Sequence, residues 1–461
     1  MDMTSDSSRR AFLKRSAALG LAGVATPFVT SLAAIGEAAA ATATDYKALV
    51  CVFLYGGMDY ANTLPAYDAD SYAKYLAARS NIALTRESLA ATVLNPVAGL
   101  SGGRQYALAP TMASLLPLFD AGKLAVTLNV GTLVQPTTKA QYQANSVRLP
   151  PKLFSHNDQQ SYFQASNPEG ATSGWGGRIG DLFQSGNGSA TLTCINASGN
   201  AVYLTGKSAV QYAIGTGGPI ALLNNASSLY GSTTAAATLR SLMTGGSAHL
   251  FASEHARVSK RALDTYAQVS GALANAPASG FTLFPSGNAL ADQLKMVARL
   301  ISVSADLGAK RQVFFVSIGG FDLHNNLVAQ HPGLVGKVAD ALRAFYDTTV
   351  ALGVADKVTS FTASDFGRTL QSNDDGSDHG WGSHHFVLGG AVKGRRFYGA
   401  PPAIGNGTAD DVGQGRLLPT IAVDQYAATL ANWFGVDNGN LTTVLPNMGN
   451  YNASNWNLGF V

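Results

Sequence analysis

The chain has 461 residues, of which only 13% are charged, and its formal net charge is +3. This length allows a large hydrophobic core, and the small net charge gives no reason to expect a surface for nucleic acid or anionic membranes. The two cysteines, Cys51 and Cys194, could pair in an oxidising compartment, but Cys51 lies in an apolar run where a buried free thiol is equally expected, so we predict no disulfide.

Residues 1–43 have the pattern of an export signal. The segment Ser8–Lys14 (SRRAFLK) is a twin-arginine motif, and a weakly apolar run follows it to about Ile35. Small residues from Ala38 to Ala43 suit cleavage by a signal peptidase. A transmembrane anchor is the alternative, but the glycines, threonines and proline of the run make a poor spanning helix. We therefore expect a periplasmic or secreted protein of residues 44–461, exported by the twin-arginine pathway, with no stable membrane span after cleavage.

The first half of the mature chain alternates between strand and helix patterns. Ala48–Leu54 is a continuous apolar run that ends at two glycines, as expected of a strand covered on both faces. Met112–Phe119 has helical spacing, and Leu124–Val130 reads as a second strand. A further helix is predicted to begin at Ser155 and continue through Phe163.

The middle of the chain has a weaker pattern. Residues 184–250 are rich in small and polar residues, with short β-like pieces at Leu192–Ile195 and Ala201–Leu204. We interpret the region around residues 184–285 as an insertion or cap over the sheet.

A clear pattern returns in the second half. Ala289–Leu307 has helical spacing, Gln312–Ile318 reads as a buried strand, Pro332–Leu352 as a second long helix and Lys357–Thr362 as another strand. The two strands and the helix between them form a β-α-β unit, which places the strands parallel. The chain is therefore predicted to be an α/β protein with a doubly wound, mostly parallel sheet.

Aspartates follow three of the predicted strands. Asp59, Asp322 and Asp365 each come shortly after a strand, and loops at the carboxyl ends of parallel strands form the ligand crevice of such sheets. Aspartate also caps turns for purely structural reasons. Three of them on one rim nevertheless indicate a common site.

Histidines are concentrated in the same part of the sequence, because five of the eight lie between Phe314 and Tyr398. Imidazoles beside carboxylates are typical ligands of a divalent cation such as Zn, Mn, Ca or Mg. His156, by contrast, is equally well explained as a residue that merely starts a helix. The predicted metal ligands are Asp59, Asp322, His324, Asp365, Asp378, His379 and His384.

Several motifs, in this order along the chain, resemble those of the DUF1501 family. They are Gly56–Asp59 with Asn62 and Thr63, Ser155–Gln160, Gly174–Arg178, Gly319–His324, Ser364–Thr369 and Asp378–Gly380. That family in turn resembles the alkaline phosphatase and sulfatase superfamily. The resemblance implies an alkaline-phosphatase-like fold, with one or two metal ions held at the carboxyl rim of the sheet.

The resemblance also implies roles for particular residues. Asp59 corresponds to the first metal aspartate, Asp322 and His324 to the middle metal pair, and Asp365 to the aspartate of the following strand. The late histidine ligand corresponds to His379 or His384. The chain departs from the superfamily at Phe366, where many members have a histidine, and in the narrow spacing of the middle pair.

The nucleophile and the anion-binding group are the remaining parts of such a site. Superfamily members attack with a serine, threonine or modified cysteine, for which Thr63 and Ser155 are the candidates here, and Arg368 is placed to neutralise a phosphate or sulfate. The expected function is hydrolysis of a phosphate or sulfate ester of a small molecule or glycan by an exported metal-dependent enzyme. The alternative is a non-catalytic exported protein that binds an envelope partner or assists envelope assembly.

Overall fold

The computed structural model describes residues 44–222 and 227–461, so the predicted export signal lies outside the described residues. Within these two ranges, no helix combines the length and the apolar character needed to cross a membrane.

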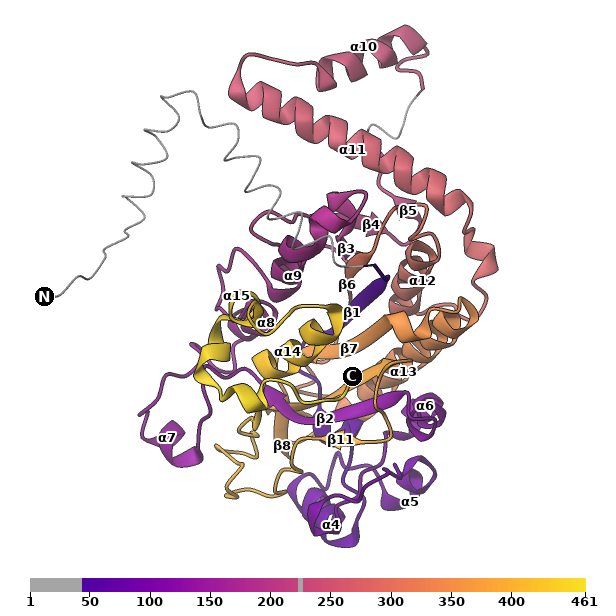
Figure 1. The fold of residues 1–461 in the computed structure, drawn as a ribbon. Coiled ribbons are helices and arrows are strands. Elements are labelled where there is room, and N and C mark those ends of the chain that lie inside the picture. Colours follow the sequence, from indigo (N-terminus) through magenta and orange to yellow (C-terminus); the bar gives the residue numbers. More distant parts are fainter. Residues whose placement is uncertain (1–43, 223–226) are drawn as a thin grey trace, which may run out of the picture.

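A ten-stranded sheet runs through the centre of the molecule (Figure 1). Its order is β11-β2-β10-β7-β1-β6-β3-β4-β5, and β12 also pairs with β2. Strands β7, β1, β6, β3 and β4 are parallel, whereas β10 is antiparallel to both of its neighbours. The strands are β1 (Lys47–Leu54), β2 (Leu124–Gly131), β3 (Cys194–Asn196), β4 (Gln211–Gly215), β5 (Gly218–Pro219), β6 (Arg311–Ile318), β7 (Val358–Ser364), β10 (Ser383–Gly389), β11 (Phe397–Tyr398) and β12 (Ile421–Ala422).

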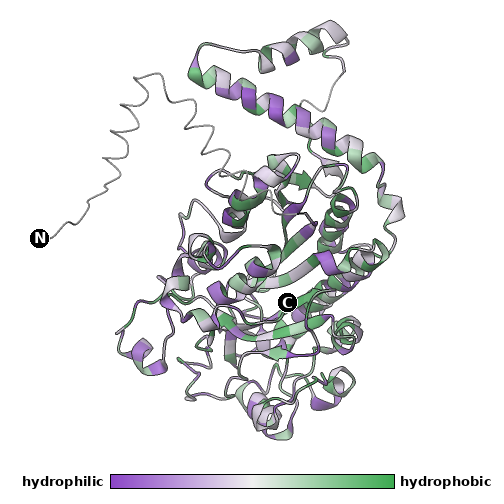
Figure 2. Ribbon diagram, in the orientation of Figure 1, coloured by the Kyte–Doolittle hydropathy of each residue, from purple (hydrophilic) through white to green (hydrophobic). Residues whose placement is uncertain are grey.

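Helices cover both faces of this sheet. Alternate residues of β1 enter two separate hydrophobic clusters, because successive side chains of a strand point to opposite faces. One cluster packs against α12 (Ala289–Ser302) and α13 (Leu327–Ala351), the other against α9 (Trp175–Phe183) and α14 (Val423–Phe434). Figure 2 shows the apolar colouring concentrated on the central strands. The predicted doubly wound, mostly parallel α/β architecture is therefore confirmed.

The predicted strands at β1, β2, β6 and β7 are present, but three other elements differ from expectation. The helix expected at Pro332 begins earlier, at Leu327. Pro332 lies in its second turn and lacks the N–H group that would donate to the carbonyl oxygen of Val328, so the helix loses one hydrogen bond there. Within the expected strand Ala201–Leu204, Val202–Leu204 forms a 3₁₀ turn packed against α9. Met112–Phe119 is divided between a 3₁₀ turn and a short helix that has Pro117 in its first turn.

The middle of the chain contributes both to the sheet and to a projection from it. Strands β3 and β4 extend the sheet beyond β6, whereas α10 (Thr233–Thr244) and the first part of α11 (Leu250–Ala274) extend away from the body (Figure 1). The last turns of α11 pack in the core through Val269, Ala272 and Leu273. The boundaries of the predicted insertion stay a prediction. Cys51 and Cys194 are both buried free thiols.

Three structural units meet at the carboxyl ends of β1, β6 and β7. The first is the set of loops that follow these strands. The second is helix α8 (His156–Ala165), which begins after Ser155 as predicted. The third is a separate two-stranded hairpin, made of β8 (Arg368–Ser372) and β9 (Ser377–His379).

Candidate metal centre

The carboxylate of Asp365, directly after β7, lies behind the centre. Asp365 is 1% exposed, and its Oδ2 atom accepts hydrogen bonds from Gly56 N at 3.0 Å, Gln160 Nε2 at 2.8 Å and His156 Nδ1 at 2.6 Å. His156 and Gln160 are four residues apart on α8 and therefore share one face of the helix. The hydrogen bond to Asp365 raises the pKa of His156, although partial burial opposes this shift.

Asp322, in the loop after β6, occupies the middle of the centre and is 43% exposed at its side chain. Its Oδ1 lies 2.6 Å from Arg368 Nη1, and its Oδ2 lies 3.3 Å from His156 Nε2. Burial opposes the ionisation of Asp322, but the hydrogen bond and charge of Arg368 outweigh it and lower the pKa. Asp322 is therefore a carboxylate at neutral pH.

Two further imidazoles face the same carboxylate. His379 Nε2 and His324 Nε2 each lie 3.1 Å from Asp322 Oδ1 and 2.9 Å from one another. His379 Nδ1 is 2.7 Å from the carbonyl oxygen of Phe154, and His324 Nδ1 is 3.1 Å from Asp378 Oδ1. Burial lowers the pKa of His379, which favours its neutral form.

These contacts define the tautomer of each ring. The Nδ1 atoms of His156, His324 and His379 all face an oxygen acceptor, so each neutral ring carries its proton on Nδ1 and leaves a lone pair on Nε2. Outer oxygen acceptors of this kind orient the histidine ligands of metal sites. All three Nε2 lone pairs converge beside Asp322.

The convergence fits a bound cation. In the described part of the chain, His156, Asp322 and His379 offer ligand atoms that all lie within 4.8 Å of one another, and His324 adjoins them. Two imidazole lone pairs 2.9 Å apart repel each other unless a cation or proton lies between them. His156 Nε2 and Asp365 Oδ1 are also buried without a hydrogen-bond partner among the described residues. Three imidazoles and one carboxylate suit zinc or manganese, whereas calcium and magnesium prefer all-oxygen ligands.

Phe366 contributes to the centre through packing. Its ring lies 4.8 Å from the ring centroid of His156 and 4.7 Å from that of His379. Gly57, with φ of +88°, brings the backbone against the same phenyl ring, where a Cβ atom would collide. Phe366, which stands where a metal ligand would be expected, thus packs against the rings of two histidines.

The structure places Asp59 outside this centre, contrary to the expectation that it would complete the metal site. Its carboxylate is 2% exposed and forms a two-pronged ion pair with Arg79, at 2.7 and 3.1 Å. Burial opposes ionisation, but the charge of Arg79 lowers the pKa of Asp59 to about 2. Both oxygens are therefore already occupied by a cation of the protein itself.

Two other expected residues are also separate from the centre. Thr63 is 1% exposed, and its hydroxyl lies 3.1 Å from His331 Nε2. His384 is enclosed between Tyr60 and Tyr106, its Nδ1 accepts a hydrogen bond from Asn129 N, and burial lowers its pKa to about 3. Both side chains are buried in the interior, away from the centre.

The remaining expected residues contact or adjoin the candidate ligands. Asp365 and Asp378 accept hydrogen bonds from histidines of the centre, and Ser155 precedes His156 with its Oγ donating to Asp158 at 3.0 Å. Arg368 is fully buried and bonds only to groups of the protein, so its expected contact with a substrate anion is not supported.

Sequence reasoning missed His156 as a candidate ligand and Gln160 as its neighbour. An isolated histidine at a helix start is usually structural, which concealed its role. The sequence did contain one indication, because His156 and Gln160 are four residues apart within the segment Ser155–Gln160. That spacing places both side chains on one face of a helix, where both contact Asp365.

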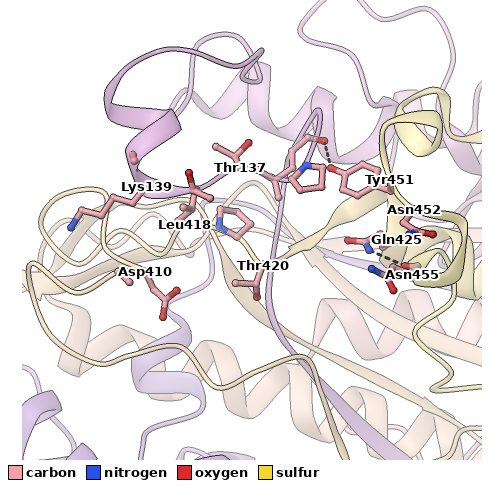
Figure 3. A pocket seen from close by; sticks show the side chains of 15 residues that line it. Thr137, Lys139, Asp410, Leu418, Thr420, Gln425, Tyr451, Asn452 and Asn455 are labelled. Carbon is pink, nitrogen blue, oxygen red and sulfur yellow. Dashed lines mark hydrogen bonds between the residues drawn. The ribbon is translucent and has the colours of Figure 1, made fainter.

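A large cleft, of about 650 Å³, lies apart from these residues. Figure 3 shows Thr137, Lys139, Asp410 and Tyr451 around it. Of the described residues at the metal centre, none lines this cleft. Lys139 is bonded to the carbonyl oxygens of residues 407 and 408, so its charge is already engaged.

Comparison with known proteins gives a family but no assigned activity. The model of a family described as a protein of unknown function (DUF1501) matches residues 46–445. No curated protein matches the chain.

Similar solved structures include three proteins at very low identity. The lipoteichoic acid synthase LtaP from Listeria monocytogenes is 9% identical, with 87% of this chain and 74% of that chain covered and a TM-score of 0.33. Ps i-CgsB in complex with k-i-k-neocarrahexaose is 9% identical, with coverages of 89% and 77% and a TM-score of 0.34. The soluble domain of lipooligosaccharide phosphoethanolamine transferase A from Neisseria meningitidis is 10% identical, with coverages of 85% and 89% and a TM-score of 0.27. TM-scores this low support no argument about this chain.

Proposed function

The chain belongs to the DUF1501 family of proteins of unknown function, and we propose from its site that it is an exported hydrolase which uses a divalent metal to cleave a phosphate or sulfate ester. The observation that carries the proposal is the convergence of three imidazole Nε2 atoms on the carboxylate of Asp322. When bound there, a divalent cation polarises an ester and stabilises the charge that develops as the ester bond breaks.

The protein's own groups prepare the ligands for this task. Asp365 accepts the Nδ1 proton of His156 and so keeps Nε2 directed at the centre. Arg368 holds Asp322 as a carboxylate in a fixed position. The side chains of Asp322 and His324 are each 43% exposed, so a substrate can reach the centre from solvent.

Cationic groups beside the centre support an anionic substrate. Arg416 packs over the ring of Phe154 at 5.0 Å and donates from Nε to the carbonyl oxygen of His379. Lys152, two residues before Phe154, has a side chain that is 69% exposed, although its Nζ also lies 3.6 Å from the buried carboxylate of Asp158, which neutralises part of its charge. Phosphate and sulfate esters carry the charge that such groups attract.

Ser155 is the better placed of the two nucleophile candidates. It is half-buried beside His156, whereas Thr63 is enclosed in the core. Attack by Ser155 Oγ on phosphorus or sulfur would release the alcohol of the ester, and water would then hydrolyse the ester formed on the enzyme. Mass spectrometry after rapid quench with an aryl phosphate would reveal the added mass on Ser155, and a Ser155→Ala variant provides the control.

Metal analysis of protein purified without chelators tests the central proposal. We expect about one zinc or manganese ion per chain, turnover of aryl phosphate or aryl sulfate, and loss of both in Asp322→Ala and His379→Ala variants. Folded protein without metal would contradict the proposal. Stoichiometric metal without turnover would instead support the non-catalytic role in binding or envelope assembly.

Export by the twin-arginine pathway remains part of the proposal and is supported by the sequence alone. Replacing Arg9 and Arg10 by lysine should retain the protein in the cytoplasm. Immunoblots of separated periplasmic and cytoplasmic fractions would measure this, and equal export of both forms would contradict it.

A further inference from the structure

We propose that the buried ion pair between Asp59 and Arg79 positions the residues of the metal centre. It does so through its hydrogen bonds to the β8–β9 hairpin. This inference rests on the proposed function, because it assumes that the centre binds a metal ion. Neither residue would contact the ion itself.

The ion pair is buried and remains charged. Asp59 and Arg79 have side chains that are 2% and 0% exposed, and the guanidinium contacts both carboxylate oxygens. Asp59 also caps helix α3 (Tyr60–Thr63) by accepting from Asn62 N at 2.9 Å. A buried pair with both partners satisfied holds one geometry, because separating the charges is costly.

Each member of the pair is hydrogen-bonded to a different strand of the hairpin. Arg79, directly after helix α4 (Ala69–Ala78), donates from Nη2 to the carbonyl oxygen of Thr369 at 2.7 Å and from Nε to that of Leu370 at 2.8 Å. Asp59 Oδ2 accepts from Ser377 Oγ at 2.9 Å. Strand β8 is therefore hydrogen-bonded to Arg79, and strand β9 to Asp59.

The same two strands bear residues that form or contact the metal centre. Arg368, the first residue of β8, donates from Nη1 to Asp322 Oδ1 at 2.6 Å and from Nη2 to the carbonyl oxygen of Ser377. His379 is the last residue of the three-residue strand that Ser377 begins. The NH group of Ser377 also donates to the carbonyl oxygen of Leu323, between Asp322 and His324.

Ser377 is thus the link between the ion pair and the ligands. It is fully buried, and its hydroxyl donates to Asp59 and accepts from Arg368 Nε at 3.4 Å, so it connects the ion pair both to the strand that bears His379 and to Arg368. A shift of this strand would move His379 directly and would move Asp322 through Arg368. Ligand geometry is sensitive to such outer contacts, whose loss typically weakens metal binding about 10- to 100-fold.

The test is the Ser377→Ala variant, which removes only this hydroxyl group. We expect its zinc affinity, measured by competition with a chromophoric chelator, to fall at least about 10-fold. The absorption spectrum of the cobalt-substituted protein should also change, because it reports the ligand geometry. Arg79→Lys keeps the charge but cannot contact both carboxylate oxygens of Asp59 with a planar guanidinium group. It should therefore show both effects as well.

Thr92→Val is the matched control. Its hydroxyl is buried and donates to the carbonyl oxygen of Leu108 at 2.6 Å, away from the hairpin. This variant should lose stability without any change in zinc affinity or cobalt spectrum.

The possible results separate this inference from the proposed function. If the parent protein binds zinc and Ser377→Ala and Arg79→Lys bind it equally well, with unchanged cobalt spectra, the positioning role is wrong and the metal centre stands. If the parent protein binds no metal, the proposed function fails and this inference fails with it.

Discussion

His156 Nδ1 lies 2.6 Å from the Oδ2 atom of Asp365, a carboxylate that solvent does not reach. This contact directs the other ring nitrogen toward Asp322 and so converts a helix-start histidine into a potential metal ligand. It also joins two segments that are 209 residues apart in sequence.

The first prediction concerns this pair. Asp365→Asn keeps the size of the side chain but removes the charge that favours the Nδ1 proton of His156, so zinc affinity should fall about 10- to 100-fold. Chelator competition would measure the change. Asp347→Asn, at a surface ion pair with Arg343, is the control and should bind zinc normally. Unchanged affinity in Asp365→Asn would show that the charge of Asp365 does not control metal binding through His156.

The second prediction concerns the close approach of the chain at Gly56. This residue has φ of +115°, and a Cβ atom there would collide with the backbone nitrogen of Asp322. Gly56→Ala should therefore displace Asp322 and abolish stoichiometric metal binding, as measured by elemental analysis. Gly102→Ala controls for backbone strain alone, because Gly102 also has a positive φ, +66°, but open space around it. Equal metal content in the two variants would contradict the prediction.

The sheet and several of the site residues could be predicted from the sequence, because they depend on local patterns. The apolar runs at β1 and β6 and the helical spacing between β6 and β7 determine the parallel order that puts Asp322 and Asp365 on one rim. That inference needs only strand direction and the position of each aspartate after its strand.

The role of Asp59 could not be predicted in the same way. Its position after β1 satisfied the same rule, but Arg79 competes for its carboxylate, and this depends on how helix α4 packs. The sequence contains no local signal for that packing. The packing role of Phe366 against two histidine rings depends likewise on tertiary contacts.

The third prediction is a loss of stability in mild acid. Burial lowers the pKa of His384 and of His385 to about 3, below the value of about 6.5 expected in the unfolded chain. Between these values the unfolded state binds more protons, so stability falls as pH decreases from about 6.5, by about 1.4 kcal/mol per pH unit for each histidine. Above pH 6.5 neither residue contributes to the pH dependence.

Urea unfolding at pH 7 and pH 5 would measure this effect. His384→Gln should reduce the difference between the two pH values, whereas replacement of the exposed His255 should leave it unchanged. Equal stability of the parent protein at both pH values would rule out the explanation.

The fourth prediction concerns the free energy of the ion pair between Asp59 and Arg79. Arg79→Leu leaves a buried carboxylate without its cation, which should lower the free energy of unfolding by about 3–5 kcal/mol. The double variant Asp59→Leu and Arg79→Leu removes both charges and should lose less than the single variant, because no uncompensated charge remains. Urea unfolding of the metal-free proteins isolates this effect from metal binding. If the double variant were as unstable as the sum of the two single variants, the residues would be energetically independent, and the pair could not act as the unit that holds both strands of the hairpin.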